Sequence, residues 1–259
     1  MGSKPYSKLA IAAAYAKYYL RASSKNKELT PTAYNVVDEV LSDARKVKHS
    51  DIEAERYRLQ KSKQVISFTD YGKSGNIFEK KVADIAKNAL KPKKYAQLIS
   101  KLVAQRGAKT ILELGTSLGI TTAYLARNEG TEVQTMEGDP TVADIAQHVW
   151  NLLGLQNIST TIGNFDVTLD QLEGKTYDVI YIDGNHNLEP TVRYFDVLLK
   201  HANAHTLFIF DDIHYSKGME EAWEAIKAHS QTTTTIDLFF IGLVYIDPSL
   251  VKQHFELRY

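Results

Sequence analysis

Acidic residues and histidines gather at two places in the second half of the chain, each directly after a hydrophobic run. Asp183 and His186 follow the first run. Asp211, Asp212 and His214 follow the second. Carboxylates that share one place repel one another unless positive charge lies between them, so we predict a cation site. Oxygen ligands favour Mg²⁺, with Mn²⁺ or Ca²⁺ as the other options. Capping of a turn or helix by these aspartates is the simpler alternative.

A second candidate site is the segment Ile111–Gly119, ILELGTSLG, in which an acid precedes a glycine turn. The part from Gly115 to Gly119 matches the G-x-S-x-G pattern of serine hydrolases, with Ser117 as the nucleophile. A strand, a glycine turn and a helix also suit a nicotinamide dinucleotide, although the spacing is not G-x-G-x-x-G. The third interpretation is an S-adenosylmethionine site, where glycine lets the backbone approach the ligand closely. A fold that keeps the turn without a nucleotide is the fourth.

The order of the downstream motifs favours the third interpretation. The pattern Glu113-x-Gly115-x-x-x-Gly119 resembles motif I of class I S-adenosylmethionine-dependent methyltransferases. The resemblance implies that Glu113 faces the ammonium group of the cofactor and that Glu137, after the second strand, binds the ribose hydroxyls. It places the adenine near the segment after the third strand. The implied cofactor site consists of Glu113, Gly115, Thr116, Ser117, Gly119, Glu137, Gly138, Gly163, Asn164, Phe165 and Asp183.

The aspartate positions resemble those of metal-dependent O-methyltransferases, both the catechol type and the type that acts on natural-product sugars. This resemblance implies a metal bound by Asp183, Asp211 and Asp212, and a general base three residues after the first of them, His186. It implies transfer of a methyl group to the hydroxyl of a small molecule. A metal-independent N- or C-methyltransferase, a serine hydrolase that uses Ser117, and a non-catalytic cofactor-binding domain remain open.

Alternating strands and helices must position these residues. A doubly wound, mostly parallel, seven-stranded Rossmann-like sheet with an antiparallel C-terminal hairpin explains the alternation. We predict a helical N-terminal cap over residues 1–75 and a methyltransferase domain over 76–259. Within the cap, residues 65–75 are expected to form a loop or hinge, and Phe78 to begin the next helical stripe. The expected strands are 110–114, 132–137, 158–162, 177–183, 206–211, 232–238 and 243–246.

Composition narrows the classes of function. The chain has 259 residues with 31 basic and 31 acidic side chains, which removes the electrostatic footprint of a general nucleic-acid binder. Its apolar runs are shorter than the roughly 18–20 residues of a membrane span. Cysteine is absent, which excludes disulfides, and we expect a cytoplasmic protein. The family resemblance implies that the N-terminal helices cover the acceptor or make a homodimer contact. Tyr15, Tyr18, Tyr19 and Tyr34 are candidates for a lid, with helix packing and surface tyrosines as the simpler alternative.

Overall fold

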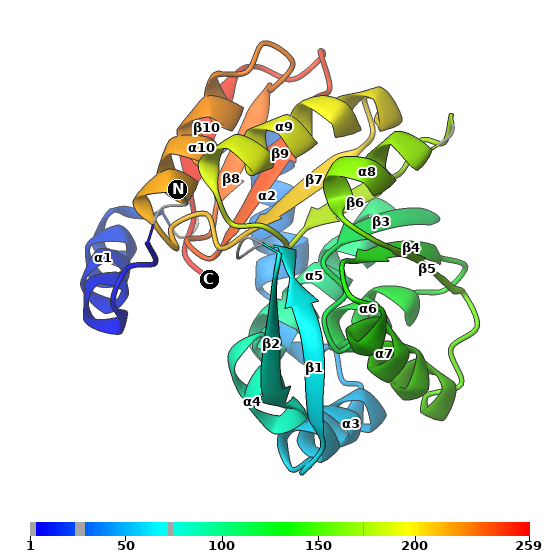
Figure 1. The fold of residues 1–259 in the computed structure, drawn as a ribbon. Helices are drawn as coiled ribbons and strands as arrows, with labels where there is room; N and C mark the ends of the chain where they lie inside the picture. Colours follow the sequence, from blue (N-terminus) through cyan, green and yellow to red (C-terminus); the bar gives the residue numbers. More distant parts are fainter. Residues whose placement is uncertain (1–3, 24–28, 72–74, 173) are drawn as a thin grey trace. The chain divides into compact units, whose positions relative to one another are not determined.

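The computed structural model describes residues 4–23, 29–71, 75–172 and 174–259 (Figure 1). The chain forms two compact units, one of Met1–Leu41 with Gly174–Tyr259 and one of Ser42–Glu173. Among the described residues, eight strands belong to one mostly parallel sheet, and two further strands form a separate hairpin. The Rossmann-like fold class is therefore confirmed, with one strand more than the sequence predicted. The domain boundary at residue 75 stays a prediction.

In the unit of Ser42–Glu173, three parallel strands lie in the order β3-β4-β5. They are β3 (Thr110–Leu114), β4 (Glu132–Glu137) and β5 (Ile158–Ile162), with the predicted bounds. After its first residue β3 is buried, as expected for a strand covered on both faces. The connecting helices are α6 (Ile120–Ala126), α7 (Pro140–Leu152) and the short α8 (Phe165–Thr168). The other helices of this unit are α3 (Ser50–Gln60), α4 (Val82–Asn88) and α5 (Lys93–Arg106).

A β-hairpin stands where the sequence predicted a loop or hinge. Strands β1 (Val65–Asp70) and β2 (Asn76–Lys81) pair antiparallel, so that Phe68 lies opposite Phe78. The loop was therefore a wrong prediction. The helical stripe is confirmed from Val82 on, where α4 buries Val82, Ile85 and Ala86, but not at Phe78, which lies on β2. Branched and aromatic residues on alternate positions favour a strand here, and a second strand supplies the hydrogen bonds that a loop would lack. Of the predicted hinge, residues 72–74 lie outside the described part of the chain.

In the other unit, the strand order is β10-β8-β9-β7-β6. The parallel neighbours are β6 (Val179–Ile182) and β7 (Leu207–Asp211). The predicted C-terminal hairpin is confirmed as the antiparallel pair β8 (Thr234–Asp237) and β9 (Ile241–Tyr245). The eighth strand, β10 (Gln253–Glu256), pairs parallel with β8 at the edge of the sheet. Its polar, alternately exposed residues gave no strand signal in the sequence.

Helices of the same unit include α9 (Leu188–Leu198) and α10 (Lys217–Ala228), which pack against each other (Figure 1). Near the N-terminus lie α1 (Lys8–Arg21) and α2 (Pro31–Asn35), which a π-helical turn over Val36–Leu41 follows. Ser7 begins α1, because its side chain accepts the N–H of Ala10. Among the described residues, no helix is long and apolar enough to cross a membrane.

Candidate functional site

The turn after β3 has the tight geometry that its glycines predict. Gly115, Ser117 and Gly119 all have positive φ angles, of 102°, 49° and 76°. The N–H of Gly115 donates to the carbonyl of Met136 over 3.0 Å, which ties the turn to the end of β4. A Cβ on Gly119 would lie 2.6 Å from Nε1 of Trp150, whose N–H donates to the Gly119 carbonyl. Glycine at position 119 is therefore required by both backbone and packing.

Glu113 supports this turn from inside the protein. Its side chain is fully buried and accepts hydrogen bonds from the hydroxyls of Thr122 and Thr135, over 2.5 and 2.7 Å. The hydroxyl of Thr116 lies 2.6 Å from that of Thr135 and extends the same network. Sequence reasoning missed both Thr122 and Thr135, because nothing in their spacing points at an acid on β3. The predicted contacts of Glu113 and Thr116 with a cofactor stay predictions.

Glu137 joins two turns at the end of β4. One carboxylate oxygen accepts the N–H of Ser117 over 2.8 Å, and the other accepts the N–H of Asp139 over 3.2 Å. Burial raises the pKa of Glu137 to about 7, although hydrogen bonds from neighbouring backbone N–H groups act in the opposite direction. Its charge therefore changes near neutral pH.

Asp139, which the sequence did not single out, connects α7 to the hairpin. One of its oxygens accepts the N–H groups of Thr141 and Val142 and so caps α7. The other accepts the N–H of Thr69 on β1 over 2.7 Å. Thr69 lies 70 residues before Asp139, a separation at which sequence spacing predicts no contact.

The segment after β5 lies beside the same strand end. The N–H of Gly163 donates to the carbonyl of Glu137 over 2.9 Å, and Gly163 has a φ of 141°. The side chain of Asn164 accepts the N–H of Asp166 and caps α8, which begins at Phe165. The predicted contacts of Gly163, Asn164 and Phe165 with an adenine stay predictions.

The second predicted site, in the other unit, brings three side chains together. Asp183, His186 and Asp211 offer ligand atoms that all lie within 4.8 Å of one another. Nε2 of His186 is 3.4 Å from a carboxylate oxygen of Asp183, and the Tyr181 hydroxyl donates to the other oxygen over 2.8 Å. Since β6 and β7 are parallel neighbours, their ends meet at one edge of the sheet. Two carboxylates and an imidazole suit a divalent cation.

Asp212 behaves differently from the other two predicted ligands. Among the described residues, the cluster does not include Asp212. Its φ is 52°, its N–H donates to the carbonyl of Phe240 over 2.8 Å, and its own carbonyl accepts the N–H of Tyr215. Asp212 thus turns the chain after β7, and its part in metal binding stays a prediction. His186 lies beside Asp183 and Asp211, the other two predicted site residues of the cluster, and its role as a base stays a prediction.

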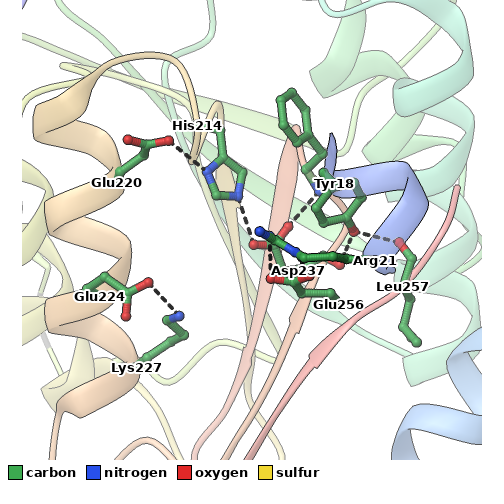
Figure 2. A network of polar contacts seen from close by, with 10 residues as sticks. Tyr18, Arg21, His214, Glu220, Glu224, Lys227, Asp237, Glu256 and Leu257 are labelled. Carbon is green, nitrogen blue, oxygen red and sulfur yellow. Dashed lines mark hydrogen bonds and ion pairs between the residues drawn. The ribbon is translucent and has the colours of Figure 1, made fainter. Parts of the chain in front are cut away.

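His214 belongs to a network that holds α1, as Figure 2 shows. Its Nε2 lies 2.8 Å from a carboxylate oxygen of Asp237, and its Nδ1 faces Glu220 at 3.5 Å. Burial by itself lowers the pKa of His214, but hydrogen bonds to these two acids and their charges outweigh burial and raise it. The hydroxyl of Tyr18 on α1 lies 2.7 Å from the carbonyls of Asp237 and Leu257. Tyr18, expected in a lid, is instead buried by packing.

Comparison with known proteins shows what this chain is similar to. Residues 112–213 match the family model of a methyltransferase domain. Catechol O-methyltransferase of Niastella koreensis is 33% identical over 126 residues, which are 46% of this chain and 55% of the relative. The resemblance to class I S-adenosylmethionine-dependent methyltransferases is confirmed. Catechol O-methyltransferase of Mycobacterium tuberculosis is 28% identical over 109 residues, 41% of this chain and 49% of the relative. The chain therefore spans about half the length of these curated relatives.

Solved methyltransferase structures share the fold. An O-methyltransferase from Bacillus cereus in complex with S-adenosylhomocysteine has a TM-score of 0.59 and 24% identity, and the match covers 81% of this chain and 97% of that one. TomG, an O-methyltransferase from Streptomyces achromogenes in complex with S-adenosylmethionine, has a TM-score of 0.59 and 18% identity, with 80% and 95% covered. Both structural matches cover about four fifths of this chain, more than residues 112–213, and they support the Rossmann-like fold.

Proposed function

We propose that this protein transfers the methyl group of S-adenosylmethionine to the hydroxyl of a small molecule, with the help of a divalent cation. One observation carries the proposal: Asp183, His186 and Asp211 form a compact cluster at the ends of two parallel strands of a methyltransferase fold. The curated relatives are catechol O-methyltransferases, whose name indicates an acceptor with two adjacent oxygens. Such an acceptor suits a cation that can hold both oxygens.

The unit of Ser42–Glu173 supplies the donor side. The left-handed residues of the turn after β3 bring backbone close to the space above the strand, and Gly119 begins a helix there. Glu137, anchored by the N–H of Ser117, is the acceptor for two vicinal hydroxyls of a ribose. In its ionised form this carboxylate accepts a hydrogen bond from each of the two hydroxyls, which fixes the position of the ribose.

The other unit supplies the acceptor side. Asp183 and Asp211 would hold the cation, and the Tyr181 hydroxyl fixes the orientation of Asp183. A bound cation supplies positive charge that lowers the pKa of an acceptor hydroxyl. His186 takes the hydroxyl proton on its imidazole, and Asp183, 3.4 Å away, stabilises the imidazolium that results. No covalent intermediate with the protein is needed.

Calorimetry of the full chain with S-adenosylhomocysteine, with and without Mg²⁺, tests the proposal. We expect binding in both conditions, because Asp183 is the one residue that the predicted cofactor site shares with the predicted metal site. Turnover on a panel of hydroxyl acceptors should then stop when EDTA is added and return with excess Mg²⁺ or Mn²⁺. Absence of binding in either condition contradicts the whole proposal. If EDTA leaves turnover intact, only the proposed dependence on a divalent cation is contradicted. That result favours a metal-independent N- or C-methyltransferase.

A further inference from the structure

Tyr71, directly after β1, fills the space that a side chain at position 138 would need. A Cβ added to Gly138 would lie 2.7 Å from Cδ2 and 3.3 Å from Cε2 of the Tyr71 ring. Gly138 is not among the glycines with a positive φ, so its backbone is open to any residue. The Tyr71 ring is therefore what excludes a side chain at position 138.

The position of Tyr71 follows from how the hairpin is held. Ile66 on β1 is buried in one apolar cluster with Val142 and Ala146 of α7. The N–H of Thr69, two residues before the ring, donates to the Asp139 carboxylate over 2.7 Å. A packed face and a charge-assisted hydrogen bond thus fix the end of β1 against the turn between β4 and α7. The ring rests on that turn for the same reason.

The residues around the Tyr71 ring suggest that the ring contacts a ligand. Gly138 directly follows Glu137, the proposed acceptor for the ribose hydroxyls. Tyr71 keeps 43% of its surface exposed although the ring contacts the turn. Aromatic rings beside a nucleoside site stack on the base or pack on the sugar, and every base has a face for such a contact. The hairpin lies outside residues 112–213, so the match to the methyltransferase domain does not imply this contact.

We propose that Tyr71 forms part of the cofactor site and that its ring packs on the nucleoside of the methyl donor. The inference rests on the proposed function, since it assumes that Glu137 binds the ribose. Gly138 then has a defined purpose, because a side chain there would push the ring off the turn. A hairpin outside the matched domain thereby completes the nucleoside site.

Replacing the ring tests the proposal directly. Tyr71→Ala should weaken binding of S-adenosylhomocysteine by about tenfold or more, as expected for one lost ring contact. Tyr71→Phe keeps the ring and should stay within about twofold of the wild type. Tyr57→Ala is the matched control, since Tyr57 on α3 of the same unit is 63% exposed. 5′-Methylthioadenosine has the nucleoside but lacks the amino-acid part. Its affinity should fall by the same factor in Tyr71→Ala. Calorimetry with each purified full-length variant gives these affinities.

Gly138→Ala provides a second test that leaves the ring in place. With Tyr71 present, the new methyl group must displace the ring and weaken S-adenosylhomocysteine binding. In the Tyr71→Ala background the methyl group has room, so its additional effect should be much smaller, a non-additivity expected for residues in contact. If Tyr71→Ala does not fold, Tyr71→Leu serves as the variant without the ring, and unchanged S-adenosylhomocysteine affinity in Tyr71→Leu overturns the inference.

The outcomes separate the two proposals. If the wild type does not bind S-adenosylhomocysteine, the proposed function fails. If the wild type binds and Tyr71→Ala binds equally well, the inference about Tyr71 fails and the proposed function stands. A lower melting temperature of Tyr71→Ala with unchanged affinity shows that the ring only stabilises the turn, which also overturns the inference.

Discussion

The two candidate sites use carboxylates in opposite ways. At the end of β4, Glu137 lies among donors of its own chain, the N–H groups of Ser117 and Asp139. At the ends of β6 and β7, Asp183 and Asp211 share a small space with the imidazole of His186. An acid surrounded by donors is prepared for hydroxyl groups, whereas two acids side by side are prepared for a cation. Under the proposed function, this difference fits donor binding at the first site and acceptor activation at the second.

Removing one acid from the cluster should produce the largest change. Asp211→Asn should lower methyl transfer by about 10³-fold or more, because the cation supplies several kcal/mol of charge stabilisation. The affinity for S-adenosylhomocysteine should stay unchanged. Steady-state turnover with Mg²⁺ and calorimetry measure the two effects. Asp196→Asn, an exposed acid on α9, is the control that should leave both unchanged. Equal losses of turnover and S-adenosylhomocysteine affinity in Asp211→Asn would break the division between the sites.

Replacing His186 sharpens the comparison by asking whether the cluster holds a base or a third ligand. A lost general base costs about 10²–10⁴-fold, and we expect His186→Gln to lose about 10²-fold in turnover. Metal affinity, measured by Mn²⁺ titration, should change little if His186 is the base. The rise of the wild-type rate with pH should disappear in the variant. A large loss of Mn²⁺ affinity with an unchanged pH profile would instead make His186 a ligand.

Gly119→Ala tests whether the donor turn is preorganised. The new Cβ would overlap Trp150 and occupy a left-handed backbone, which together should destabilise the protein by about 2–4 kcal/mol. Gly107→Ala is a matched control, because Gly107 also has a positive φ but no atom within 4 Å of an added Cβ. Urea unfolding should show a clearly smaller loss for Gly107→Ala. Equal losses would mean that only the backbone, and not Trp150, requires the glycine.

The smallest expected effect is a pH dependence of donor binding. Because burial raises the pKa of Glu137 to about 7, its carboxylate binds a proton more tightly in the folded chain than in the unfolded one. This group therefore stabilises the fold below its unfolded pKa, and the contribution is lost as pH rises through 7. Asp139, whose charge adds to the upward shift, is the acid beside it.

Binding of a ribose needs the ionised form, so the sign is reversed for the ligand. The dissociation constant of S-adenosylhomocysteine should rise about tenfold from pH 8 to pH 6, because only the ionised fraction binds. Glu137→Gln should bind more weakly at pH 8 and show a flat profile. Calorimetry at three pH values measures both, and a profile in Glu137→Gln as steep as in the wild type would assign the pH dependence to another group.

Some predictions succeeded because they depend on local pattern. The bounds of β3, β4 and β5 follow from runs of strand-favouring residues that each end directly before a glycine, at Gly115, Gly138 and Gly163. Parallel strands end at a common edge, so residues placed directly after β6 and β7 had to come close together. That is why Asp183, His186 and Asp211 were predictable as a group from the sequence.

Other features depend on contacts between residues far apart in the chain. Asp212 follows Asp211 directly, yet among the described residues it is not part of the cluster, and its left-handed backbone could not be predicted from its residue type. Strands β1 and β2 can be recognised as strands only once they are seen to pair with each other. Each of these strands has six residues, and their antiparallel pairing is what distinguishes them from a loop.

The sequence by itself thus determined the order of the strands, the glycine turn and the residues at the strand ends, because each is written in spacing and side-chain type. Only the tertiary structure decided which of these side chains meet. It joined Glu113 to Thr122 and Thr135, Asp139 to Thr69, and the Tyr71 ring to Gly138. The physical reason is that spacing fixes a local backbone conformation, whereas packing selects partners across the chain, where sequence distance carries no information.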